Sequence, residues 1–319
     1  MNDDELQNST LQRSAPPISH LLGTTPVTRL VRWATSSRFR VLAYHDVPDP
    51  IPFSRQLDLI CKNYRPISGA DVVTARAAGR QLPHRAIWLT FDDAHPGVLA
   101  HALPLLAERQ LPATLFVCPG LVDTDLPYWW QVIEVAIARG LSIEFDGKIW
   151  SDPSLITYLK SVPDTVRRAV VADVTAEISG SGDVITVQQV TSEQLRSWLN
   201  AGLELGNHTW DHPCLDTCTD EQQRDQIIAA DDWLRRLVGR STRLFAFPNG
   251  NVTPASRRIL ADLGYTVTAL FDHRLSRLNG PEVSRLRVDA CASAERFCAI
   301  ASGAHSTAFA MKRRMQRKR

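Results

Sequence analysis

Two adjacent carboxylates, Asp92 and Asp93, follow the apolar segment 87–91, which reads Ile-Trp-Leu-Thr-Phe. A carboxylate can bind a metal ion, and it can also take a proton from a reacting water. The apolar segment predicts a strand that is covered on both faces. Because side chains alternate along a strand, we expect one carboxylate to face a metal and the other to face a substrate. The competing interpretation is a strand followed by a solvated acidic turn.

Two histidines, His208 and His212, lie four residues apart after another predicted strand. On a helical turn this spacing places both rings on one side, as binding to one divalent cation requires, although such a pair can also arise by chance. Asp93 is available as a third ligand. Two imidazoles and one carboxylate leave a coordination position open, which is typical of a catalytic zinc or iron site. A closed zinc site with Cys214 and Cys218 would leave Asp93 without a role.

The elements that would position these residues alternate between short apolar strands and amphipathic helices. Strands are predicted at 39–44, 87–91, 113–118, 203–206, 244–247, 265–270 and 285–289. This alternation implies an α/β fold with a mainly parallel sheet or barrel. The pattern is interrupted at about 121–190, where helical segments follow one another. We expect this insertion to fold over one face of the domain.

Composition fits a soluble globular protein. The chain of 319 residues is 44% hydrophobic and 22% charged, and it contains no run of 18 apolar residues. We expect a flexible leader over residues 1–37, an α/β domain over 38–305 and a basic tail over 306–319.

Charge is concentrated at the C-terminal end, where six of the last eight residues are Lys or Arg, although the net charge is only +2. A weak contact between this tail and an anionic membrane is one interpretation, and a solvated terminus is the simpler one. No nucleic-acid partner is expected. The N-terminal region is acidic and lacks a basic segment followed by an apolar core, which predicts a cytoplasmic protein with reduced cysteines.

Three motifs together carry a resemblance to a known family. They are residues 90–94 (TFDDA), 208–212 (HTWDH) and 245–250 (FAFPNG), and they are preceded by 42–47 (LAYHDV). In this order they resemble the motifs of the polysaccharide deacetylase family, also called the NodB homology family or carbohydrate esterase family 4. The resemblance covers about residues 38–305 and implies a distorted (β/α) barrel of about seven strands.

The resemblance also implies a reaction and its residues. Asp93, His208 and His212 would bind a divalent metal, with zinc favoured and cobalt, nickel, manganese or iron as alternatives. Asp92 would be the base that takes a proton from a water whose pKa the metal lowers. This water would attack the N-acetyl group of an amino-sugar-containing saccharide, and the metal and a backbone N–H near Asn249 would hold the developing oxyanion. Acetate and a free amine would result.

Other residues would support this site. Thr209 would fix the histidine loop by hydrogen bonding. Tyr44 and His45 would lie beside the site or touch the substrate. Arg285 could touch the substrate or pair with an acidic neighbour. The indole rings of Trp129 and Trp130 could form a wall for a sugar ring or belong to the core.

The chain departs from the family pattern at three positions. Ala94 stands where glycine is usual, which costs little if φ is negative there. Ala246 stands where many members have an arginine that orients the catalytic aspartate, so we expect Asp92 to lack this partner and to have a higher pKa. No Leu-x-His motif is present near the C-terminal end, where the general acid is usual. His273 and His45 are the candidate replacements.

Two functions therefore compete. The first is a metal-dependent hydrolase that removes N-acetyl groups from an amino-sugar-containing saccharide. The second is a non-catalytic saccharide-binding protein that retains the metal pocket. The sequence leaves open the sugar, its linkage or carrier, and the oligomeric state.

Overall fold

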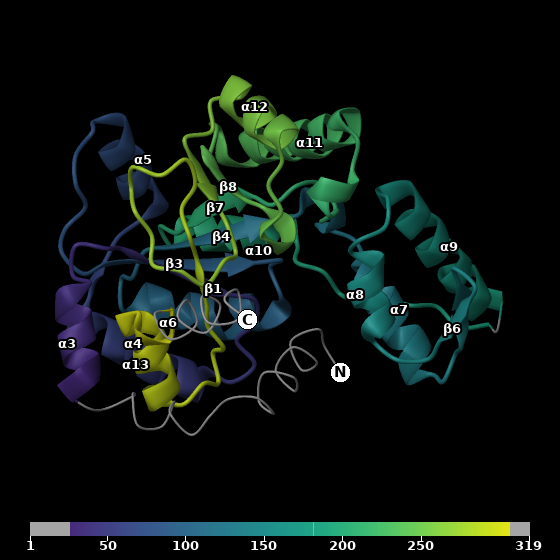
Figure 1. Ribbon diagram of the computed structural model, residues 1–319, viewed down its shortest axis with the longest axis horizontal. Coiled ribbons are helices and arrows are strands. Elements are labelled where there is room, and N and C mark those ends of the chain that lie inside the picture. The colour runs from purple at the N-terminus through teal and green to yellow at the C-terminus, as the bar shows by residue number, and fades with distance from the viewer. Residues whose placement is uncertain (1–25, 181, 307–319) are drawn as a thin grey trace, which may run out of the picture.

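A parallel β-sheet forms the centre of the computed structural model, which describes residues 26–180 and 182–306 (Figure 1). The strands have the order β10-β1-β3-β4-β7-β8-β9, and β2 pairs with β3. Neighbouring strands run parallel because each connection returns the chain to the same end of the sheet. The bounds are β1 (Arg40–Tyr44), β2 (Arg65–Pro66), β3 (Ala86–Asp92), β4 (Ala113–Val117), β7 (Glu204–Asn207), β8 (Leu244–Ala246), β9 (Val267–Ala269) and β10 (Leu286–Arg287).

The two ends of the sheet approach each other at Val283. The Leu270 N–H donates to the Val283 carbonyl at 2.9 Å, and the Val283 N–H donates to the Thr268 carbonyl at 2.8 Å. The same segment continues into β10, where Leu286 pairs with Leu42 of β1. The sheet thus curves into a distorted (β/α) barrel, and the predicted fold class is confirmed.

Helices cover the outside of this barrel. They are α4 (Pro50–Asn63), α5 (Gly69–Ala77), η1 (Val98–Ala102), α6 (Leu103–Glu108), α10 (Ser192–Asn200), α11 (Asp220–Val238), α12 (Pro254–Asp262) and α13 (Ala294–Ser302). Two of them begin at predicted signals: the Gln194 N–H donates to the Thr191 hydroxyl ahead of α10, and Pro254 opens α12. Such caps satisfy N–H groups that have no partner within the helix.

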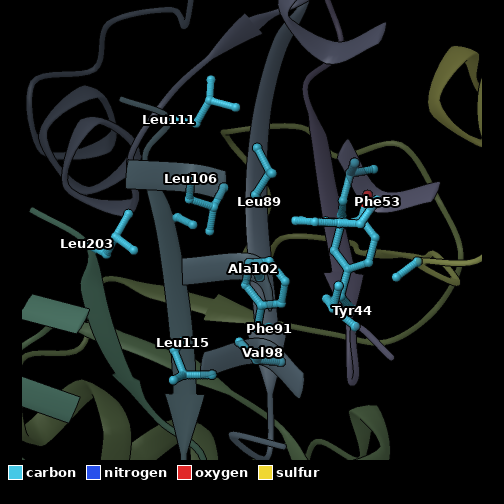
Figure 2. Packing of buried hydrophobic residues seen from close by; sticks show 14 of the residues in the cluster. Tyr44, Phe53, Leu89, Phe91, Val98, Ala102, Leu106, Leu111, Leu115 and Leu203 are labelled. Carbon is cyan, nitrogen blue, oxygen red and sulfur yellow. The ribbon is translucent and has the colours of Figure 1, made fainter. Parts of the chain in front are cut away.

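The main hydrophobic core lies between the sheet and the helices (Figure 2). Tyr44 belongs to this core, because its ring stacks on Phe91 and packs edge-on against Phe53 while its hydroxyl donates to Gln56 Oε1 at 2.9 Å. The expectation that Tyr44 lies in the functional site was wrong. Side chains alternate along β1, so Tyr44 faces the helices and the next residue, His45, reaches the end of the barrel.

The insertion forms a lobe beside the barrel (Figure 1). It contains α7 (Trp129–Ala138), the hairpin strands β5 (Ile143–Phe145) and β6 (Lys148–Trp150), α8 (Ser154–Leu159) and α9 (Asp164–Gly180). Ile133, Ile156 and Leu159 are buried in a core of its own. The helices match the prediction, whereas the hairpin was not predicted.

The ends of the described chain lie together. Helix α3 (Pro26–Ala34) forms where we expected a flexible leader, and the Thr35 hydroxyl donates to the Ser302 carbonyl at the end of α13 at 3.1 Å. That part of the prediction was wrong. The rest of the expected leader, residues 1–25, and the basic tail from 307 onward lie outside the described residues. Among the described helices, none combines the length and the apolar character needed to cross a bilayer.

Candidate active site

The two adjacent carboxylates lie at the C-terminal end of β3. Asp92 is the last residue of the strand, whereas Asp93 and Ala94 have φ values of 64° and 55°. This left-handed turn breaks the alternation of the strand, so both carboxylates line one cavity. Within this cavity Asp93 lies beside the two histidines and Asp92 lies beside Arg285. The condition for a small cost at Ala94, a negative φ, is not met, and the left-handed conformation costs an alanine about 1–2 kcal/mol.

The histidine loop follows β7, the strand next to β4. It is not a helical turn, because Thr209 and His212 have φ values of 70° and 61°. The Thr209 N–H donates to Asn207 Oδ1 at 2.8 Å, and the Thr209 hydroxyl accepts the His212 N–H at 3.2 Å. The rings of His208 and His212 nevertheless meet, with centroids 4.9 Å apart. The predicted convergence is present, but a hydrogen-bonded loop produces it instead of a helix.

Three potential metal ligands converge at this point. Asp93 Oδ1 lies 3.6 Å from His208 Nε2 and 3.7 Å from His212 Nε2, and one ligand atom from each residue lies within 4.8 Å of the others. Asp93 Oδ1 is buried and has no hydrogen-bond partner among the residues that the structure describes. His208 Nδ1 lies 2.8 Å from the Ala246 carbonyl, which can only accept, so Nδ1 carries the proton and Nε2 presents a lone pair to the cluster. These features suit a divalent metal.

Burial controls the charge of two of these groups. It raises the pKa of Asp93, and the nearby His208 and His45 oppose this effect. Burial also lowers the pKa of His212 well below its ordinary value, and the neighbouring His208 and Lys160 add to the effect. His212 is therefore a neutral imidazole at neutral pH, which is the form that binds a metal.

Asp92 has a buried cationic partner. Arg285 Nη1 lies 2.7 Å from Asp92 Oδ1, and Arg285 Nε donates to the Leu270 carbonyl at 2.9 Å. Burial raises the pKa of Asp92, but Arg285, followed by His208 and His45, outweighs burial and holds the pKa below its usual value. The expectation that Asp92 lacks an arginine partner and has a higher pKa was therefore wrong. The partner comes from the segment before β10 instead of from position 246.

These groups line a cavity of about 410 Å³. His45, His273, Asn249 and Arg285 all reach it, as expected for residues beside the site. The His45 ring packs edge-on against Phe271, with centroids 5.4 Å apart. Thr209 is not among the lining residues, but its hydrogen bonds with Asn207 and His212 hold the histidine loop.

The insertion supplies part of the cavity wall. Apart from the Trp pair, the sequence did not predict these residues. Trp130, Lys160 and Gln189 line the cavity, and Trp130 stacks on Tyr128 with centroids 4.5 Å apart. Trp129 and Trp130 both pack against the core of the insertion, and Trp129 does not line the cavity. Of the two interpretations of the Trp pair, Trp130 therefore fits both, whereas Trp129 fits only the core.

His95 is a residue of the cavity that the sequence did not single out. It lies before η1, lines the cavity and has Nδ1 2.7 Å from Asp46 Oδ1. Its position two residues after Asp93 was the available signal. Burial raises the pKa of Cys214, so it stays a thiol, and neither Cys214 nor Cys218 joins the ligand cluster found among the described residues.

Comparison with known proteins identifies the family. Residues 79–268 match the family model described as polysaccharide deacetylase, which is more than half of the chain. The chain therefore belongs to the polysaccharide deacetylase family. It is also 32% identical over 104 residues to the poly-β-1,6-N-acetyl-D-glucosamine N-deacetylase of Escherichia coli, a match that covers 28% of this chain and 15% of that enzyme.

Solved structures share the fold. The deacetylase PplD of Streptococcus pyogenes, in complex with acetate, has a TM-score of 0.58 at 18% identity and covers 83% of this chain and 98% of its own. IcaB of Ammonifex degensii has a TM-score of 0.57 at 20% identity and covers 83% of this chain and 97% of its own. At these identities the likeness shows the barrel architecture.

Proposed function

We propose that the protein is a metal-dependent hydrolase that removes N-acetyl groups from an amino-sugar-containing saccharide. The observation that carries this proposal is the convergence of Asp93, His208 and His212, with Asp92 beside them in the same cavity. A binding protein would need the three ligands but would have no use for a second carboxylate held in place by a buried arginine.

The metal and Asp92 have separate roles in this proposal. A divalent metal held by Asp93, His208 and His212, most simply zinc, would supply Lewis-acid activation of water and of the acetyl carbonyl. Asp92 takes the proton of the attacking water. The Arg285 guanidinium keeps the pKa of Asp92 low, so the carboxylate is ionised at neutral pH and ready to accept that proton.

The departing amine needs a proton, and His45 is the donor that we favour. His45 and His273 both line the cavity. His45 lowers the pKa of both Asp92 and Asp93, which places its ring near the two carboxylates. General acid catalysis of this kind typically contributes ~10²- to 10⁴-fold.

The cavity wall suits a sugar ring. The indole of Trp130 offers an apolar face, and Gln189 and Asn249 bring amide groups that can bond to hydroxyls. The name of the Escherichia coli relative specifies a polymer of N-acetylglucosamine. An N-acetylglucosamine-containing saccharide is therefore the substrate that we propose to test first.

The alternative is a saccharide-binding protein without catalytic activity. Two features of the sequence supported this alternative: Ala246 stands where an arginine is usual, and the Leu-x-His motif of the general acid is absent. Arg285 supplies a cation to Asp92, and imidazoles reach the cavity, so both grounds are weaker in the structure than in the sequence.

One experiment separates the two functions. Bound metal is measured by elemental analysis, and acetate release is followed with chito-oligosaccharides and with β-1,6-linked N-acetylglucosamine oligomers. The hydrolase predicts bound metal and acetate, and Asp92→Asn is the matched variant that should retain the metal and release acetate much more slowly. Bound metal without acetate from either oligomer would favour the binding protein. Absence of bound metal after reconstitution would contradict the proposed site.

A further inference from the structure

Helix α9 of the insertion reaches the histidine loop. Arg168 Nη1 and Nη2 lie 2.9 Å from Asp211 Oδ2 and Oδ1, a bidentate pair. Asp211 is the residue before His212, within the loop that carries both histidines. This pair therefore joins the insertion to the backbone that presents the proposed metal ligands.

Arg168 is itself held in place. Its Nε donates to Asp164 Oδ2 at 2.7 Å, and Asp164 is only 3% exposed. Asp164 also pairs with the buried Arg167, which donates to Thr217 Oγ1 at 3.3 Å, beyond the histidine loop. Hydrogen bonds to Asp211 and then to Asp164 raise the pKa of Arg168 despite its partial burial. The guanidinium is thus oriented toward Asp211 by its surroundings.

The loop is held from the barrel side as well. Gln226 Oε1, on α11, accepts the N–H groups of Trp210 at 3.0 Å and Asp211 at 3.2 Å. The loop contains two residues with positive φ, Thr209 and His212, and such conformations persist when the surrounding structure imposes them. The loop is therefore held both by the barrel and by the insertion.

The start of α7 adds two contacts to the same site. The Tyr128 hydroxyl donates to the Asp93 carbonyl at 2.9 Å. The Trp130 ring packs edge-on against the His212 ring, with centroids 4.7 Å apart. The insertion thus contacts the backbone of one proposed ligand and the ring of another.

We propose that Arg168 is a positioning residue for the metal site and that the insertion, through the Arg168–Asp211 pair, holds the histidine loop in its metal-binding conformation. This inference rests on the proposed metal-dependent function. Without the Arg168–Asp211 pair, the loop keeps its hydrogen bonds to Gln226 on the barrel side but loses its ion pair with the insertion. His212 then samples positions away from Asp93 and His208, and the affinity for the metal falls.

The test measures the metal affinity of the full-length protein. The metal-free protein is titrated with Zn²⁺ or Co²⁺ against a competing chelator, for the wild type, Arg168→Ala and Arg168→Lys. We expect about tenfold weaker binding in Arg168→Ala. Arg168→Lys should not restore the wild-type affinity, because lysine cannot form the bidentate pair. Acetate release by Arg168→Ala should recover when the metal is saturating, since the loss lies in positioning.

A matched pair in the same insertion is the control. Arg139 Nη1 lies 3.0 Å from Asp183 Oδ2, and neither residue lines the cavity. Arg139→Ala should leave the metal affinity unchanged. Equal affinity in the wild type and Arg168→Ala, or an equal loss in Arg139→Ala, would overturn the inference.

Two further measurements test whether Arg168 and Asp211 act as a pair and separate this inference from the proposed function. Asp211→Asn removes the negative charge of the pair. If the two residues act together, adding Arg168→Ala to Asp211→Asn should cause little further loss of metal affinity. This variant also serves if Arg168→Ala does not fold. A wild-type protein that binds no metal would overturn the proposed function, whereas a metal-binding wild type with an unaffected Arg168→Ala would overturn the positioning role alone.

Discussion

Arg285 forms a buried ion pair with Asp92, although the two residues are 193 positions apart in the chain. Arg285 comes from the segment that joins the two ends of the sheet, and Asp92 ends a central strand. The barrel therefore provides the cation that Ala246 cannot. The pair keeps the proposed base ionised inside a buried site.

Replacing Arg285 should shift the pH dependence of the reaction. In Arg285→Ala the effect of burial on Asp92 is less opposed, so the pKa of Asp92 rises. The acid limb of the kcat/KM profile should then move to higher pH. Arg285→Lys, which retains a charge, should cause a smaller shift. An acid limb that stays in place in Arg285→Ala would show that Asp92 is not the titrating base.

The same pair should contribute to stability in a pH-dependent way. The pKa of Asp92 is lower in the folded protein than its usual value of about 3.9. Its contribution is therefore complete above that value and is lost as the pH falls through the folded pKa. Removing one partner of a buried pair costs about 3–5 kcal/mol at neutral pH. Urea unfolding of the wild type and Arg285→Ala, from neutral pH down to about pH 3, should show the difference shrinking as the solution becomes acidic.

The two adjacent aspartates should respond differently to substitution. Asp93→Ala should lose the metal, because it removes one of three ligands. Asp92→Asn should retain the metal and lose ~10²- to 10⁴-fold in kcat. Elemental analysis and acetate release measure the two effects. Equal loss of metal in both variants would contradict the assigned roles.

The two candidate proton donors can be separated by pH profiles. His45→Ala should lower kcat by ~10²- to 10⁴-fold and remove the basic limb of the profile, because the amine then leaves without a positioned acid. His273→Ala should retain the basic limb. The reverse pattern would assign the donor role to His273.

Trp130 should affect substrate binding more than the chemical step. An aromatic contact of ~0.5–1.5 kcal/mol corresponds to a KM that rises about 2- to 13-fold in Trp130→Ala. Trp130→Phe keeps an aromatic face and should cause a smaller rise. Trp129→Phe is the control, because Trp129 packs against the core of the insertion but does not line the cavity. A similar rise in KM for both positions would argue against a sugar-binding wall.

Much of the fold could be predicted because burial patterns are local. The apolar run of β3, the capping box at Thr191 and the proline of α12 each report on a few neighbouring residues. The alternation of strands and helices then implied parallel strands whose ends meet at one edge. For this reason Asp93 and the two histidines could be placed together before their coordinates were known.

Conformations that depend on distant parts of the chain could not be predicted in the same way. The positive φ values of Asp93 and His212 follow from how the loops pack, so the sequence predicted neither the left-handed turn after β3 nor the loop that replaces the expected helical turn. The contact between Arg168 and Asp211 depends on how the insertion lies against the barrel. No periodicity within either segment reports on that arrangement.

Sequence alone was sufficient for the kind of residue at each strand end, and so for the metal-binding chemistry that those residues could support. The tertiary structure determined which residues became partners. Asp92 is paired with Arg285 from the segment before β10, and the histidine loop is paired through Asp211 with Arg168 of the insertion. The physical reason is that side-chain type and spacing encode local burial. The charge and position of a buried carboxylate depend instead on whichever distant groups the closed barrel brings into contact with it.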